Sequence, residues 1–217
     1  MNNKEKSKVI LRELNKIYPK VPIPLNYKNT FTLLISVLLS AQCTDVNVNN
    51  VTKNIYPKYN QPKHFIKLGR KKIERLINKI GIFRVKAKNI YFLSKTLVEK
   101  YKSKVPKTYE ELESLPGVGH KTASVVMSQA FGYPAFPVDT HIHRLAQRWG
   151  LTNGKNVVQT EKDLKKIFTK KHWNRLHLQI IWYGREYCKA RDCYGISCKI
   201  CKSCYPNRKK PITTKKA

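Results

Sequence analysis

The strongest constraint on the fold is a series of helix-type apolar patterns that runs along the chain and is interrupted only by short breaks. Near the N-terminus Ile10, Leu14 and Ile17 fall at i, i+4 and i+7, the spacing of one helix face, before Pro19 ends the segment. No run of alternating β-branched residues bounded by turn signals occurs. The sequence therefore predicts an all-α fold.

The remaining helices are delimited by glycines, prolines and capping residues. Thr30 can cap a helix that runs through Gln42 and is apolar on nearly every side, so we expect it to be buried. Its apolar stretch, residues 31–41, is too short to span a bilayer. Further helices are expected over 46–55, 70–79, 87–101, 119–131 and 140–149, with two more between 157 and 187.

The charge balance narrows the choice of partner. The chain carries 44 Lys and Arg against 13 Asp and Glu, a formal net charge of +31. This excess favours a polyanion, because a basic residue that neutralises a phosphate releases counterions, although nucleotide bias in the gene can account for part of it. A hydrophobic share of 41% excludes a wholly disordered basic protein. Without an apolar signal core at the N-terminus, we expect an intracellular protein, cytoplasmic or nucleoid-associated, with no membrane contact.

The most informative stretch is LPGVGHKTA, residues 115–123. Gly117 and Gly119 flank Val118, which predicts a tight turn between helices whose backbone N–H groups point outward at a helix N-terminus. Such a turn, continued by His120, can bind a phosphate. The alternative is an ordinary connection between two helices.

A second polar group opens a later helix. Asp139 follows Lys121 by 18 residues, in the stretch VDTH. It can be the N-terminal cap of its helix, a structural role, or its carboxylate can face Lys121. The residues alone leave both roles open.

Five of the six cysteines lie close together near the C-terminus, at positions 188, 193, 198, 201 and 204. Disulfides are disfavoured inside cells, so this cluster favours a metal site. By count, four thiolates suit a [4Fe–4S] cluster or a zinc ion equally well.

Several motifs in the same order resemble the helix–hairpin–helix DNA glycosylases and, among them, the endonuclease III family. They are LLSAQCTDVNVN, IGIFRVKAKNI, LPGVGHKTA, VDTHIHRLAQRWG and the terminal cysteines, which together extend over nearly the whole chain. The resemblance implies an enzyme of base-excision repair that acts on double-stranded DNA. It would remove oxidised pyrimidines and cleave the abasic site by β-elimination through a lysine Schiff base.

The resemblance also implies roles for single residues. Lys121 matches the nucleophile that attacks C1′ of a nucleotide turned out of the duplex, and Asp139 matches the catalytic carboxylate. Gln42 matches the residue that fills the vacated space, and Ile82 matches an apolar wedge on the other strand. Without the resemblance, a surface Gln42 and an Ile82 in the core are the simpler readings.

Two other functions share part of this pattern. A monofunctional adenine glycosylase acting on mispairs has the turn and the aspartate but lacks a lysine at the position of Lys121. A non-catalytic DNA-binding protein could use the same hairpin and basic surface. His120 stands where the family more often has Arg or Gln, which puts its own contact with DNA in doubt.

The cysteine spacing departs from the family pattern C-x6-C-x2-C-x5-C. Cys188 and Cys204 match its outer pair and Cys198 matches its third position, but Gly195 stands at the second. Cys193 or Cys201 must then supply the fourth ligand. The compact C-x2-C-x2-C run favours the set Cys188, Cys198, Cys201 and Cys204, and the resemblance favours [4Fe–4S] over zinc.

We expect two helical domains in a monomer. Residues 22–133 would form a six-helix domain with the helix–hairpin–helix, and 1–21 with 134–217 would form the domain of the iron–sulfur cluster. A cleft between them would hold Lys121 and Asp139. Residues 207–217 carry five basic residues and no acid, which predicts a frayed basic tail.

Overall fold

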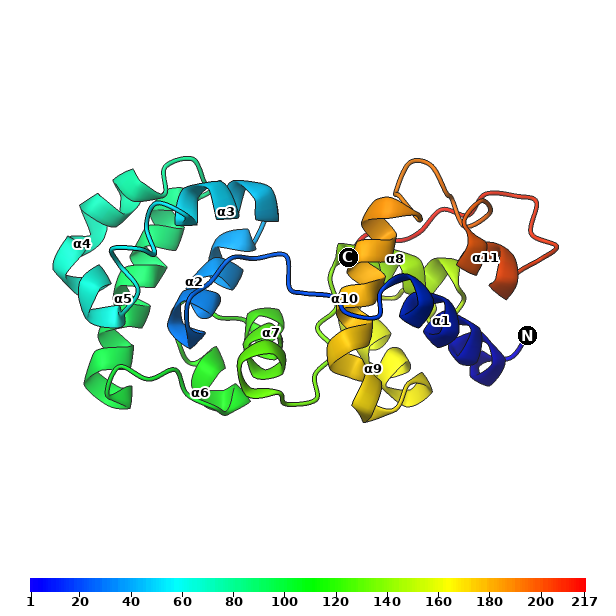
Figure 1. The fold of residues 1–217 in the computed structure, drawn as a ribbon, viewed down its shortest axis with the longest axis horizontal. Coiled ribbons are helices and arrows are strands. Elements are labelled where there is room, and N and C mark those ends of the chain that lie inside the picture. Colours follow the sequence, from blue (N-terminus) through cyan, green and yellow to red (C-terminus); the bar gives the residue numbers. More distant parts are fainter. The chain divides into compact units, whose positions relative to one another are not determined.

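The computed structural model describes all 217 residues, and every regular element in it is a helix (Figure 1). The all-α prediction is confirmed. The chain divides into two compact units, residues 1–23 with 133–217 and residues 24–132. None of the helices is both long enough and apolar enough to cross a membrane.

Each unit has its own set of helices (Figure 1). The unit of residues 24–132 holds α2 (Thr30–Ser40), α3 (Asp45–Thr52), α4 (Pro62–Leu76), α5 (Phe83–Tyr101), α6 (Tyr109–Glu113) and α7 (His120–Phe131). The other unit holds α1 (Asn3–Ile17), α8 (Thr140–Arg148), α9 (Val157–Ile167), α10 (Lys170–Glu186) and α11 (Lys199–Cys204).

Helix α2 is the core of the unit of residues 24–132. Every side chain from 31 to 39 is buried, as expected of a helix that is apolar on nearly all sides. Asn29 caps its N-terminus, and α3, α5 and α7 pack against it. Helix α4 packs along α5, and Phe65 of α4 meets Phe31 of α2 edge to face at 5.5 Å between ring centroids. Helices α3, α5 and α7 thus all pack on one buried central helix, α2.

Several helix ends differ from the expected ones; among them, α3 ends at Thr52 instead of 55 and α4 ends at Leu76 instead of 79. Helix α2 ends at Ser40 instead of Gln42, because Ala41 leaves the helical conformation (ψ 118°) and Gln42 then has a left-handed backbone (φ 53°). Helix α5 begins at Phe83 instead of 87, directly after the left-handed Ile82 (φ 57°). Helix α4 begins as early as Pro62, and the break expected at Gly69 is a kink within it (φ 70°). The short helices α6 and α11 were not expected.

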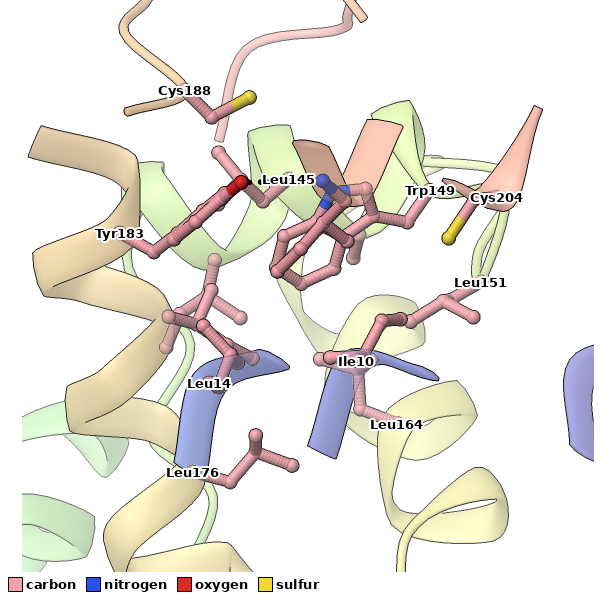
Figure 2. Close-up of a cluster of buried hydrophobic side chains, with 14 of the residues drawn as sticks. Ile10, Leu14, Leu145, Trp149, Leu151, Leu164, Leu176, Tyr183, Cys188 and Cys204 are labelled. Carbon is pink, nitrogen blue, oxygen red and sulfur yellow. Dashed lines mark hydrogen bonds between the residues drawn. The ribbon is translucent and has the colours of Figure 1, made fainter. Parts of the chain in front are cut away.

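The core of the other unit surrounds Trp149 and Tyr183, whose ring centroids lie 6.1 Å apart (Figure 2). Helices α1, α8 and α10 supply most of its apolar side chains, among them Ile10, Leu14, Leu145, Leu176 and Ile180. Both tryptophan and tyrosine are almost fully buried. This core includes cysteines from the C-terminal segment, so the cysteine-rich segment is part of the packed interior.

The prediction of a frayed tail over 207–217 is wrong. Lys215 N donates to Gln147 Oε1 at 2.8 Å, and Gln147 Nε2 donates back to Lys215 O at 3.1 Å. The Arg208 guanidinium donates to Gly195 O at 3.1 Å. The positive charge of the tail predicts a solvated segment, but hydrogen bonds between side chains and backbone groups hold the tail against its own unit.

Candidate active site and metal centre

The Gly-Val-Gly turn joins α6 to α7. Gly117 has φ 79°, and a Cβ there would lie 2.5 Å from Asn89 Nδ2, so glycine is required both by conformation and by space. Val118 is buried and its N–H donates to Leu115 O at 3.0 Å. Gly119 occupies the N-cap of α7, where no side chain caps the helix. The turn therefore offers backbone N–H groups and the positive end of α7 to an anion.

Lys121 lies in the first turn of α7, immediately after this anion site, and its side chain is exposed. An amine that must reach a nucleotide needs such access. His120 beside it is held in place: its Nδ1 is 2.8 Å from Glu113 Oε1, and its ring stacks on Tyr109 at 5.5 Å between centroids. A histidine held in this way occupies the position at which the family more often has Arg or Gln.

Asp139 belongs to the other unit and is the N-cap of α8. Its Oδ1 accepts a hydrogen bond from Ile142 N at 2.8 Å, the capping role that the sequence allowed. Burial lowers the pKa of the nearby His141, and the Asp139 charge opposes that shift only in part. A neutral His141 suits its contact with Arg144, whose Nη2 lies 3.3 Å from Nδ1. Asp139 is half-buried, so its carboxylate is only partly open to solvent.

Gln42 and Ile82 lie at two exposed loop tips of the unit of residues 24–132. Both have positive φ, which is rare for residues other than glycine, and Ile82 is 55% exposed. The reading of Ile82 as a core residue is therefore wrong. The two tips are neighbours, since a Cβ on Gly81 would lie 3.6 Å from Gln42 O. Exposed side chains on fixed tips are what insertion between bases requires.

The sulfurs of Cys188, Cys193, Cys198 and Cys201 all lie within 4.8 Å of one another and are buried, so these four residues form a candidate metal site. Cys201 Sγ is 3.9 Å from Cys188 Sγ and 3.8 Å from Cys193 Sγ. Hydrogen bonds, first with Cys188, lower the pKa of Cys198 to about 7 and also lower the pKa of Cys193. Hydrogen bonds within the group raise the pKa of Cys188 and of Cys201, so two of the four thiols lose protons readily and a bound metal would displace the protons of the other two.

This group differs from the expected ligand set in one member, because Cys193 belongs to it and Cys204 does not. Figure 2 shows Cys188 beside Tyr183 and Cys204 on the opposite side, near Trp149 and Leu151. Burial raises the pKa of Cys204 to about 11, which keeps it a neutral core thiol.

The loop conformation explains why Cys193 joins the group. Tyr194 (φ 46°) and Gly195 (φ 81°) are consecutive left-handed residues and turn the chain directly after Cys193. Cys198 N consequently donates to Cys193 Sγ at 3.5 Å. A cysteine spacing pattern taken from relatives does not contain this reversal of the chain after Cys193.

Arg148 is a residue of the metal site that sequence reasoning missed. Its guanidinium is buried and donates from Nη1 to Cys188 Sγ at 3.2 Å and to Lys189 O at 2.7 Å. From Nη2 it donates to Ala190 O at 2.9 Å. A buried cation beside a sulfur stabilises the thiolate. In a chain with 44 basic residues no pattern distinguishes this one.

Residues 35–170 match the model of the family described as HhH-GPD superfamily base excision DNA repair protein. This match assigns the chain to a class of helical proteins that repair DNA by base excision.

The relatives are more specific. The chain is 39% identical over 211 residues to "Endonuclease III" of Bacillus subtilis (strain 168), an alignment that covers 97% of this chain and 96% of that one. Identity to "Endonuclease III" of Escherichia coli (strain K12) is 42% over 198 residues, with 91% and 94% covered. The chain belongs to the endonuclease III family of DNA glycosylases and abasic-site lyases.

Solved structures agree. The fold matches "Structure of a Trapped Endonuclease III-DNA Covalent Intermediate: Estranged-Adenine Complex" with a TM-score of 0.87 and 43% identity, over 92% of this chain and 94% of that one. A thermostable thymine-DNA glycosylase shares the fold at a TM-score of 0.78 and 22% identity.

Proposed function

We propose that this enzyme removes oxidised pyrimidines from double-stranded DNA and cleaves the resulting abasic site through Lys121. The observation that carries the proposal is an exposed lysine in the first turn of α7, directly after an uncapped Gly-Val-Gly turn. The turn supplies N–H groups for a phosphate, so the lysine is held next to the DNA backbone.

Lys121 supplies the chemistry of both steps. Its Nζ forms a bond to C1′ while the bond from C1′ to the base breaks and the base leaves with a proton. One proton of Nζ passes to the departing base. The second passes to O4′ as the C1′–O4′ bond breaks, so the sugar ring opens and Nζ and C1′ form a Schiff base. The Schiff base makes the 2′ hydrogen acidic, so its removal expels the 3′ phosphate and nicks the strand.

Asp139 assists this chemistry. A carboxylate stabilises the positive charge that develops on the sugar as the base leaves, and it can take part in proton transfer at Lys121. The cap hydrogen bond from Ile142 N occupies Oδ1 and fixes the orientation of the carboxylate. Its role comes from the family resemblance and is a proposal for this chain.

Gln42 and Ile82 hold the duplex open. Turning a nucleotide out of the stack costs on the order of a few kcal/mol, and a side chain that fills the space offsets part of that cost. The amide of Gln42 can hydrogen-bond the base left without a partner, and Ile82 can wedge the other strand. The exposure of both residues supports these roles.

The four thiolates of the metal site would hold a [4Fe–4S] cluster. The number and kind of donors fit, and the family resemblance favours this group. Sulfur distances of 3.8 and 3.9 Å also suit four ligands around one zinc ion, which is the second candidate. Either group would be structural and would fix a loop that carries Lys189, Arg191, Lys199 and Lys202. Lys199 Nζ lies 2.6 Å from Glu13 Oε2 and Lys189 Nζ lies 3.9 Å from Asp192 Oδ2, so Arg191 and Lys202 are the charges of this loop that we propose for DNA.

We propose that the enzyme acts as a single copy on chromosomal DNA inside the cell. No partner subunit is needed for the roles given above. The excess positive charge would favour association with the nucleoid.

Three duplexes test this function, bearing thymine glycol, a preformed abasic site or an adenine mispair. We expect nicking of the first two and no reaction with the third. Base release without nicking would indicate a monofunctional glycosylase. Binding without either reaction would leave a non-catalytic DNA-binding protein.

A further inference from the structure

Helix α5 begins directly after Ile82, and its first two turns also contact two other elements that the proposed function assigns to DNA. Lys86 reaches the C-terminal end of α2, next to Gln42. Asn89 lies against the Gly117 turn. Lys86 and Asn89 are three residues apart and therefore lie on neighbouring positions of one helix face.

Lys86 is unusual because its side chain points into the protein. It is only 6% exposed, and its Nζ donates to Leu39 O at 2.9 Å and to Ala41 O at 2.6 Å. Leu39 O belongs to the last turn of α2 and Ala41 O to its C-cap residue, so both carbonyls lie at the negative end of the helix dipole. Burial lowers the pKa of Lys86. An inward lysine at this place cannot serve as one of the phosphate-binding charges.

Asn47 connects the loop of Gln42 to the loop of Ile82. Asn47 Nδ2 donates to Lys79 O at 2.8 Å, which ties α3 to the turn before Ile82, and the same nitrogen lies 3.3 Å from Cys43 Sγ. Gln42, between the Lys86 contact and the Asn47 contact, holds a left-handed backbone. Such a conformation persists only where its surroundings impose it.

The third element rests on α5 in the same way. The Asn89 side chain fills the space beside Gly117, where a Cβ would come within 2.9 Å of Asn89 Cβ and Cγ. Backbone of the phosphate-binding turn thus contacts α5 directly. Contacts with helix α5 therefore hold the turn and both loop tips.

We propose that Lys86 is a positioning residue that fixes the Gln42 loop to the start of α5, so that Gln42, Ile82 and the Gly117 turn meet the DNA as one preorganised surface. The inference rests on the proposed roles of Gln42 and Ile82. It predicts that Lys86 acts on extrusion of the nucleotide and has little effect on the chemistry at Lys121.

The first test needs no DNA. Hydrogen–deuterium exchange of the full-length protein is compared for wild type, Lys86→Met and the control Lys95→Met, which removes an exposed charge further along α5. We expect faster exchange over 40–44 and 81–84 in Lys86→Met alone, with the rest of the unit unchanged. Unchanged exchange in these loops would overturn the proposal. If Lys86→Met does not fold, Lys86→Arg, which keeps the charge but displaces the donors, takes its place with the same expectation.

The second test is a double-mutant cycle with Gln42→Ala, using the single-turnover rate of base removal from a thymine glycol duplex. We expect Lys86→Met and Gln42→Ala each to lower this rate roughly tenfold, because a displaced group loses its alignment. The double variant should be no slower than the slower single variant, since Gln42 is already misplaced. Borohydride trapping on a preformed abasic site should change by less than about threefold.

Independent, additive losses in the cycle would contradict the proposal, as would a loss of trapping equal to the loss of base removal. The two tests also separate this inference from the proposed function. A wild-type enzyme that cuts none of the duplexes would refute the proposed function, while the exchange of the loops would still decide whether Lys86 holds them.

Discussion

Replacing Lys121 with alanine is expected to abolish nicking of abasic-site DNA and to remove the borohydride-trapped adduct. No other group can replace the amine that forms the Schiff base, so we expect the lyase rate to fall by roughly 10³-fold or more. Affinity for the duplex should fall only a few-fold, because one exposed charge among 44 basic residues is lost. The measurements are strand cleavage under single-turnover conditions, adduct yield after reduction, and binding at a fixed salt concentration.

The matched control is Lys100→Ala, which removes an exposed lysine at the far end of α5. It should nick DNA at the wild-type rate. An undiminished adduct in Lys121→Ala would assign the nucleophile to another amine. A parallel collapse of binding and cleavage would instead indicate that Lys121 acts mainly in DNA affinity.

The second large effect is expected at the metal site, where Cys193→Ala and Cys204→Ala should behave in opposite ways. Loss of Cys193 removes one of four ligands, and since metal binding contributes to the free energy of folding, we expect lost metal and a markedly lower Tm. Loss of Cys204 leaves a small cavity in the apolar core, a cost of about 1–2 kcal/mol, with full metal content.

Metal content per chain and thermal unfolding of the purified proteins measure this contrast. Iron with equimolar sulfide would identify the cluster, and zinc without iron would identify the single ion. Metal loss in Cys204→Ala together with metal retention in Cys193→Ala would restore the ligand set expected from the sequence.

The sequence predicts the helices well where a single physical cause decides them. The run of apolar residues over 31–39 has to be buried, and α2 is buried there throughout. The Gly-Val-Gly turn has to bend the chain, because Gly117 is the residue that tolerates its left-handed backbone beside Asn89. Local conformation and apolar burial are both encoded within short segments.

The structure departs from these expectations where residues distant in sequence decide the local conformation. Gln42 was expected inside a helix, but Lys86, 44 residues later, holds the carbonyls at the end of α2 and the helix stops at Ser40. Cys204 was expected as a ligand, but α11 carries Cys201 into the group and Cys204 into the core one turn later. Neither contact leaves a trace in spacing or composition.

In the candidate site, too, some residues could be predicted from the sequence and others could not. Lys121 and Asp139 could be named from motifs, and their positions at the starts of α7 and α8 agree with those motifs. Arg148 and Lys86 could not, because a buried basic residue is indistinguishable by sequence from the many exposed ones. Such residues are found only through their hydrogen-bond partners.

Peptide mapping of the trapped wild-type complex tests the covalent role of Lys121 most directly. The enzyme is reduced with borohydride on a duplex with an abasic site, digested, and the peptide that carries the sugar remnant is sequenced by mass spectrometry. The account predicts the modification on Lys121, in the peptide that follows the Gly-Val-Gly turn. A modification on any other lysine or on the N-terminal amine would contradict it.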